Sequence, residues 1–290
     1  MPALWMIVSC FFFACMGVCV KLASDDFSTG EIVFYRGFIS LLMMLALAAS
    51  RGTALRTPNW RMHLSRSLSG AIALMCYFFA IGQLPLATAV TLNYTSPLFV
   101  AVLLALLFGE RLRWPAVLAV LTGFAGVVLL LRPTLQPEQW LGAASGLASG
   151  ALASVAYVSL RQLGRSGEPE VRTVFWFSIM TAVVGLAWAL AGEIHPPGPT
   201  GLATLIGVGL FGGLAQLAMT RSYRYGRTVV SANLSYATVI FASLFGMLLW
   251  DERMPASAWA AIALIITGAI AVSLATRTRA TPAPGAAARN

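Results

Sequence analysis

Charged side chains are scarce in this chain: 10% of its 290 residues are Asp, Glu, Lys or Arg, whereas 59% are hydrophobic. A soluble domain carries about 25% charged residues. So few charges cannot cover the surface of a water-soluble fold. The mean hydropathy of +0.81 agrees with this, and the composition predicts an integral membrane protein.

Acidic residues are absent from the middle of every apolar run. All ten Asp and Glu residues fall in connections or near the ends of runs. Carboxylates inside the membrane are the usual mark of proton and cation relays. We therefore predict a facilitator or exchanger that runs down the gradient of its substrate, without coupling to protons.

Groups that perform chemistry or hold metals are also few. His63 and His195 are expected in connections, and the four cysteines lie in apolar runs with no His or carboxylate nearby. An enzyme needs a nucleophile beside a base, or a metal cluster, at one depth. Buried free cysteines behave as small hydrophobic residues. We predict no catalytic residue, no metal site and no cofactor.

Long apolar runs are what the sequence has in abundance. A transmembrane helix needs about 20 apolar residues. Ten such runs can be read, at about 3–23, 32–50, 64–83, 87–108, 115–131, 141–160, 171–191, 201–220, 228–250 and 257–275. They predict an all-α membrane protein with ten transmembrane helices. Segment 276–290, rich in Ala, Pro, Thr and Arg, is expected to be a disordered cytoplasmic tail.

The net charge of +9 indicates membrane topology rather than nucleic-acid binding. With the N-terminus in the cytoplasm, 15 of the 19 Lys and Arg fall on the cytoplasmic side, which leaves Lys21, Arg36, Arg132 and Arg253 outside. This is the positive-inside pattern. It predicts a multi-pass protein of a bacterial-type inner membrane, with both termini cytoplasmic, the lipid bilayer as partner and no nucleic acid.

One six-residue phrase occurs twice. Residues 106–111 read LLFGER and residues 248–253 read LLWDER, and each phrase precedes a run with a matching glycine, Gly126 or Gly268 (126 + 142 = 268). Five runs precede the break at 132–139 and five follow it, so the two copies cross the membrane in opposite senses. We expect two five-helix repeats of inverted topology, 3–131 and 141–275. In secondary transporters this arrangement places the substrate near the midplane, between the halves.

Ten spans in a 5 + 5 inverted repeat, with a Glu-Arg turn after the fourth and ninth, resemble the EamA-type branch of the drug/metabolite transporter superfamily. The most similar segment is 93–99, NYTSPLF, followed by FGER at 108–111. Within that branch the chain looks like the YddG-type exporters of aromatic and other neutral amino acids. The resemblance implies an alternating-access carrier of such small molecules. A carrier of another metabolite, such as S-adenosylmethionine or riboflavin, is the first alternative, and a channel or structural membrane protein is the second.

Neutral polar and aromatic side chains lie deep enough in the runs to line a substrate cavity. Such groups hydrogen-bond a small zwitterion, or stack on a ring, at a lower cost of burial than a charge. For Tyr77 and Gln216, hydrogen bonding between helices is the alternative. The candidates for substrate binding are Tyr77, Asn93, Tyr94, Ser96, Tyr157, Trp176, Gln216, Asn233 and Tyr236.

Two cations are candidates for a gate. Lys21 and Arg36 could each meet a substrate carboxylate, or close a gate with Asp25, Asp26 or Glu31. For Lys21 the alternative is snorkelling to the lipid headgroups. A charge one turn inside a span, as at Arg36, needs a partner or water.

Two further patterns are interpreted as structural. Gly142, Gly146 and Gly150 form a double GxxxG motif that permits close helix packing. We expect it to pack within a monomer, with a dimer face as the alternative. The glutamates of the Glu-Arg turns, Glu110 and Glu252, are expected to be paired residues of connections.

Overall fold

The computed structural model describes residues 2–96, 98–100, 102–103, 114–134, 137–225, 231, 234–252 and 255–275. Within these ranges every regular element is a helix and no strand occurs. Several residues singled out in the sequence, namely Pro97, Glu110, Arg111, Asn233, Arg253 and the tail 276–290, lie outside the described residues.

The helices are long and mostly apolar. They are α1 (Pro2–Ala23), α2 (Thr29–Arg51), α3 (Trp60–Gln83), α4 (Leu86–Asn93), α6 (Trp114–Thr134), α7 (Trp140–Arg165), α8 (Glu170–Ala189), α9 (Pro199–Tyr225), α11 (Ala237–Trp250) and α12 (Ala256–Ala275), with a 3-10 turn η1 (Pro137–Gln139) before α7. In the described part of the chain, six of them (α1, α2, α3, α7, α8 and α9) have the length and composition to cross a membrane. The protein is therefore a multi-pass membrane protein.

Local sequence sets the ends of α2. The Ser28 hydroxyl accepts a hydrogen bond from the Glu31 backbone N–H (3.3 Å), and the Glu31 carboxylate accepts one from the Ser28 N–H (2.8 Å). This reciprocal pair is a capping box, which satisfies two N–H groups that the first helical turn leaves free. The helix ends at Arg51 and is capped by Gly52, whose φ of 61° is left-handed backbone that glycine adopts without strain.

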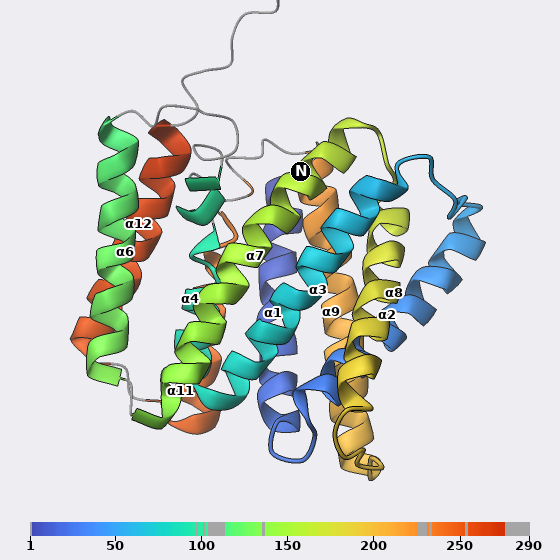
Figure 1. Ribbon diagram of the computed structural model, residues 1–290, viewed down its shortest axis with the longest axis horizontal. Helices are drawn as coiled ribbons and strands as arrows, with labels where there is room; N and C mark the ends of the chain where they lie inside the picture. Colours follow the sequence, from blue (N-terminus) through green and yellow to red (C-terminus); the bar gives the residue numbers. More distant parts are fainter. Residues whose placement is uncertain are drawn as a thin grey trace, which may run out of the picture.

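Helices from distant parts of the chain pack together in pairs (Figure 1). α2 lies along α8, α1 along α9, α3 along α7, α4 against α11, and α6 along α12. In each pair one helix precedes η1 and the other follows it. The first and second parts of the chain are therefore interleaved through the whole structure.

The α6–α12 pair contains one close contact made twice. A Cβ atom added to Gly126 would lie 2.9 Å from the Ala261 carbonyl oxygen, and one added to Gly268 would lie 2.8 Å from the Ala119 carbonyl oxygen. The two contacts are equivalent, because 119 + 142 = 261 and 126 + 142 = 268. Both helices use a glycine to bring their backbones together.

A second reciprocal contact joins the ends of α2 and α8. Glu31, at the start of α2, accepts a hydrogen bond from the His195 backbone N–H after α8 (2.7 Å). Arg172, at the start of α8, donates to the Ala54 carbonyl after α2 (2.7 Å). Here the offset is 141 residues, since 31 + 141 = 172 and 54 + 141 = 195.

The glycine stripe of α7 faces α3 and α4. A Cβ at Gly142 would lie 2.8 Å from Gln83 Cβ, and one at Gly146 or Gly150 would lie 3.0 Å from an atom of Leu92. The stripe therefore packs inside the chain.

The sequence prediction for the start of α3 was wrong. The helix begins at Trp60 rather than near residue 64, so His63 lies inside it, and the side chains of His63 and Arg66 are only 1% and 3% exposed. His63 is therefore not in a connection, and Arg66, expected among the basic residues of the cytoplasmic side, is buried. Hydropathy places a helix end where charge begins, but here the polar side chains turn toward neighbouring helices instead of water.

Candidate substrate cavity

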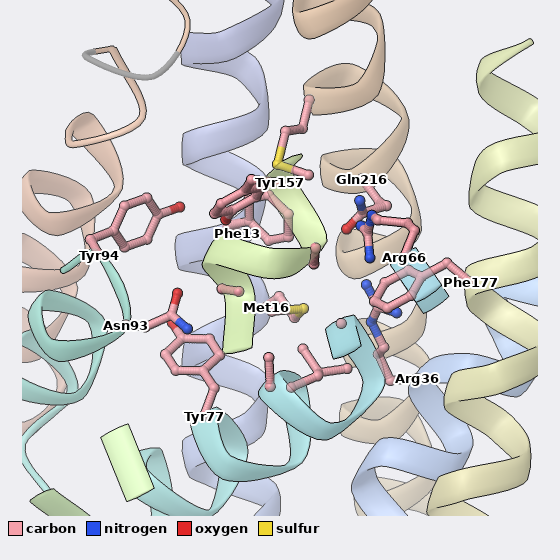
Figure 2. A pocket seen from close by; sticks show the side chains of 16 residues that line it. Phe13, Met16, Arg36, Arg66, Tyr77, Asn93, Tyr94, Tyr157, Phe177 and Gln216 are labelled. Carbon is pink, nitrogen blue, oxygen red and sulfur yellow. The ribbon is translucent and has the colours of Figure 1, made fainter. Parts of the chain in front are cut away.

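A cavity with polar groups in its wall lies among seven helices of the structure, with about 590 Å³ of empty space that includes the open solvent at its mouth (Figure 2). Its walls come from α1, α2, α3, α4, α7, α8 and α9. The larger side chains around it are Phe13, Met16, Arg36, Arg66, Tyr77, Asn93, Tyr94, Tyr157, Phe177 and Gln216.

The structure brings six of the predicted site residues to this one cavity: Arg36, Tyr77, Asn93, Tyr94, Tyr157 and Gln216. They arrive from both parts of the chain, which sequence spacing alone could not show. Arg36, predicted as a gate residue, forms part of the cavity wall.

Tyr94 is held where a helix breaks. α4 ends at Asn93, and a turn at residues 94–95 separates it from the helical residues that follow. The Tyr94 hydroxyl is 2.8 Å from the Thr238 hydroxyl of α11, and its ring centroid is 6.2 Å from that of Tyr236. Residues 235–236 also form a turn, just before α11, and 94 + 142 = 236. The break after α4 and the turn before α11 therefore meet at Tyr94, which lines the cavity, and broken helices are found at the binding sites of transporters.

Three of the substrate-binding candidates that the structure describes do not line this cavity. Ser96 is buried beyond the α4 break, and Tyr236 is buried beside Tyr94, with its hydroxyl unpaired among the described residues. The Trp176 indole N–H instead donates to the Leu55 carbonyl (3.2 Å). Asn233 lies outside the described residues.

The prediction for Trp176 missed by one residue. Its neighbour Phe177 supplies the ring in the cavity wall. Successive residues of an α-helix point about 100° apart. Depth in the span can be judged from sequence, but the side of the helix that faces the centre was misjudged here.

Arg66 was also missed, and it changes the electrostatics of the site. The central guanidinium carbons of Arg36 and Arg66 lie 4.7 Å and 4.3 Å from the centre of the Phe177 ring. Helical spacing holds a clue, because Arg66, Gly70 and Tyr77 follow one another at i, i+4 and i+11 and all three line the cavity.

The two arginines have no counter-charge in the wall. No Asp or Glu is among the described residues that line the cavity. The Nε and Nη1 atoms of both Arg36 and Arg66 are buried without a hydrogen-bond partner. A buried unpaired ion costs several kcal/mol. Contact between a desolvated cation and an aromatic ring recovers about 2 kcal/mol of that cost. The cavity is therefore an environment that favours an anionic group.

Several charges away from the cavity are paired. Lys21 Nζ lies 2.6 Å from Glu252 Oε1 and 3.3 Å from the Leu84 carbonyl oxygen, while the same carboxylate accepts from the Leu86 N–H (2.9 Å). Lys21 thus joins α1 to the turn after α11. A gate with Asp25, Asp26 or Glu31 was one of the roles predicted for Lys21, and in this structure its partner is Glu252 instead.

Glu168 forms a second paired cluster. Its carboxylate accepts hydrogen bonds from Thr57 (2.6 Å), Asn59 (2.9 Å) and Arg172 (2.8 Å), and lies 3.4 Å from His63 Nε2. Burial raises the pKa of Glu168, but these hydrogen bonds and the Arg172 charge outweigh burial and hold the pKa at about 2. The cluster fastens the α2–α3 connection to the α7–α8 connection.

A multi-pass helical protein with a polar cavity walled by both parts of its chain has the makeup of a small-molecule transporter. The model of the EamA-like transporter family matches the chain twice, over residues 1–132 and 140–274, and the chain belongs to this family. It is a transporter and not an enzyme.

Curated relatives carry different cargoes. A pseudopaline exporter of Pseudomonas aeruginosa is 30% identical over 267 residues, covering 92% of this chain and 94% of the exporter. A riboflavin transporter of Vibrio cholerae is 28% identical, covering 91% and 90%. An S-adenosylmethionine uptake transporter of Rickettsia bellii is 22% identical, covering 86% and 84%. The chain is thus a metabolite transporter by its similarities, with relatives that move unlike molecules.

A solved crystal structure has the same fold. It matches with a TM-score of 0.70 at 23% identity, over 94% of this chain and 98% of the other.

Proposed function

We propose that this protein is a secondary transporter that moves small carboxylate-bearing metabolites across a bacterial inner membrane by alternating access, with both termini in the cytoplasm. The observation that carries the proposal is the central cavity, where Arg36 and Arg66 lie without a protein counter-charge beside neutral hydrogen-bonding groups. A carboxylate is the simplest group that complements a guanidinium, through two parallel hydrogen bonds.

An inverted repeat supplies the mechanism. The 142-residue offset relates the Gly126 and Gly268 contacts, and the 141-residue offset relates the contacts made by Glu31 and Arg172. The family model also matches two successive segments. Two near-equivalent halves have two near-equivalent packings, so rocking of one against the other exposes the cavity to each side in turn.

Neutral and aromatic amino acids are the first substrates to test. In this proposal Arg36 or Arg66 binds the carboxylate, Tyr157 and Phe13 pack on an aromatic side chain, and the carbonyl oxygen of Gln216 or Asn93 accepts from the ammonium group. Net export follows where the cytoplasmic concentration is higher.

A carrier of another metabolite is the second candidate, and the named relatives favour it. The two arginines argue against a substrate whose cationic group sits beside them, because like charges in a low-dielectric site repel strongly.

Flux into proteoliposomes tests these alternatives. A panel of Phe, Met, Thr, S-adenosylmethionine and riboflavin is offered to vesicles with and without internal unlabelled substrate. We expect saturable, trans-stimulated uptake of at least one carboxylate-bearing compound, reduced at least about tenfold when Arg36 and Arg66 are both replaced by Met. Non-saturable flux without trans-stimulation would indicate a channel instead.

A further inference from the structure

Two guanidiniums in one cavity call for more negative charge than a single carboxylate supplies. Arg36 and Arg66 are 1% and 3% exposed, and both contact the same ring, Phe177. Arginine keeps its proton in proteins, so both side chains are cationic. The cavity wall therefore holds two positive charges at one end.

The other carboxylates of the surrounding helices are already engaged. Glu31 accepts hydrogen bonds from Ser28 and His195, Glu252 pairs with Lys21, and Glu170 pairs with Arg224 (2.8 Å). Glu168 is held by its own cluster of donors. None of these described carboxylates lines the cavity, so none neutralises its two arginines.

The cavity has two chemically different ends, as Figure 2 shows. Arg36, Arg66 and Phe177 lie at one end, with Gln216 beside them, whereas Tyr77, Asn93 and Tyr94 lie at the other. The first end is cationic, and the second offers only neutral donors and acceptors. A molecule that fits both ends carries its negative charge at one end and neutral polar groups at the other.

The two cations are close enough to serve one molecule. Their central carbons lie 4.7 Å and 4.3 Å from one ring centre, so they are at most 9.0 Å apart, the sum of the two distances. Small side chains keep this space open: a Cβ at Gly70 would overlap the Arg66 guanidinium, and one at Gly212 would lie 3.2 Å from Arg36 Nε. Two carboxylates on one short carbon chain can reach both guanidiniums together.

We propose that the substrate carries two anionic groups, one for each arginine, so that short dicarboxylates, acidic amino acids among them, bind in preference to neutral amino acids. This inference rests on the proposed transport function and narrows its substrate class. Phe177 holds the two guanidiniums beside each other through cation–π contact. The carboxylates complete the coordination that the protein leaves open at Nε and Nη1 of each arginine.

Competition and counterflow in proteoliposomes test the proposal. The probes are glutarate and glutamate, with two carboxylates each, and butyrate and phenylalanine, with one. For the wild type we expect half-maximal competition by glutarate at a concentration at least tenfold below that of butyrate. Arg36→Met and Arg66→Met should each weaken glutarate at least tenfold and change butyrate far less, so that the preference disappears. Arg61→Met, at an exposed arginine of the same helix as Arg66, should leave the preference unchanged.

The outcomes separate this inference from the proposed function. Saturable transport of phenylalanine or butyrate with no preference for two carboxylates would overturn the inference and leave carboxylate transport standing. Saturable transport of none of the four probes would overturn both. If a methionine variant fails to fold, Arg36→Lys and Arg66→Lys keep the charge but lose the planar guanidinium. They should retain the preference more weakly, and an unchanged preference in both would contradict bidentate binding.

Discussion

The cavity and the two ends of the helix bundle handle charge in opposite ways. At the ends, Lys21, Glu168 and Glu252 each have a partner within 2.8 Å. In the cavity, Arg36 and Arg66 share only an aromatic ring. Paired charges stabilise a fixed arrangement of helices, whereas unpaired ones leave the arrangement dependent on a ligand. This difference distinguishes the ends of the bundle, where paired charges fix the helices, from the cavity, where unpaired charges are available to a ligand.

Removing the carboxylate at the best-paired end should have the largest effect on stability. Glu168→Gln removes the negative charge and replaces the oxygen that accepts from Arg172 with an amide NH2, whereas the remaining carbonyl oxygen can still accept from Thr57 and Asn59. The folded-state pKa of about 2 lies below the ordinary value of 4.5, so Glu168 stabilises the fold above pH 4.5 and loses that effect as the pH falls toward 2. The shift corresponds to about 3 kcal/mol.

Thermal unfolding in detergent from pH 7 to pH 3 measures this effect. The wild type should lose stability below about pH 4.5, and Glu168→Gln should start lower at pH 7 and decline less. Glu193→Gln, at an exposed glutamate, is the control and should match the wild type. Equal pH profiles for Glu168→Gln and the wild type would mean that this cluster does not fasten the two connections.

The unpaired cations should make the empty carrier slow to change sides. An occluded, empty cavity would strip water from two guanidiniums with no anion to replace it, at a cost of several kcal/mol. Each 1.4 kcal/mol slows the step tenfold. We expect uptake of labelled glutarate to rise at least about tenfold when vesicles contain unlabelled glutarate, and a protonophore to leave it unchanged. Equal rates into loaded and empty vesicles would show that the arginines do not limit the return step.

Replacing either cavity arginine should raise stability even as it removes the preference for two carboxylates. A buried ion without a partner is unfavourable, so Arg36→Met and Arg66→Met should each stabilise the empty protein by about 1 kcal/mol, after loss of the contact with Phe177. Thermal unfolding without substrate measures the change. Arg61→Met should stay within about 0.5 kcal/mol of the wild type. A destabilised methionine variant would mean that the arginine serves the fold.

Much of the fold could be predicted because the hydropathy of consecutive residues identifies a long apolar helix without any knowledge of what packs against it. The first run, predicted at 3–23, is α1 at Pro2–Ala23, and the seventh, predicted at 171–191, is α8 at Glu170–Ala189. At α3 the same method placed the start of the helix too late, because the first residues of that helix are polar. The number of spans and the 5 + 5 division stay predictions.

The site was harder to predict because it depends on which side of each helix faces the centre. Tyr77, Tyr94 and Gln216 could be found from depth and chemistry alone, since neutral polar groups deep in a span rarely face lipid. Arg66, inside the predicted run 64–83, was counted with the basic residues of the cytoplasmic side, because a single sequence does not distinguish a cation that faces water from one that faces a cavity. The Lys21–Glu252 pair joins residues 231 positions apart, and no local pattern indicates it.

The smallest expected effect is at that outer pair. Lys21 and Glu252 are 19% and 11% exposed, so water screens their attraction, and we expect a coupling energy of about 1 kcal/mol. Lys21→Met, Glu252→Gln and the double variant form a thermodynamic cycle in thermal unfolding, and Lys21→Met with Glu193→Gln is the uncoupled control. If the pair also serves as a gate, each single variant should change the transport rate by about two- to threefold, and the double variant should change it no further. Additive effects of the two substitutions on the rate would show that the residues act separately, and the gate proposal for Lys21 would then fail even if the ion pair stabilises the fold.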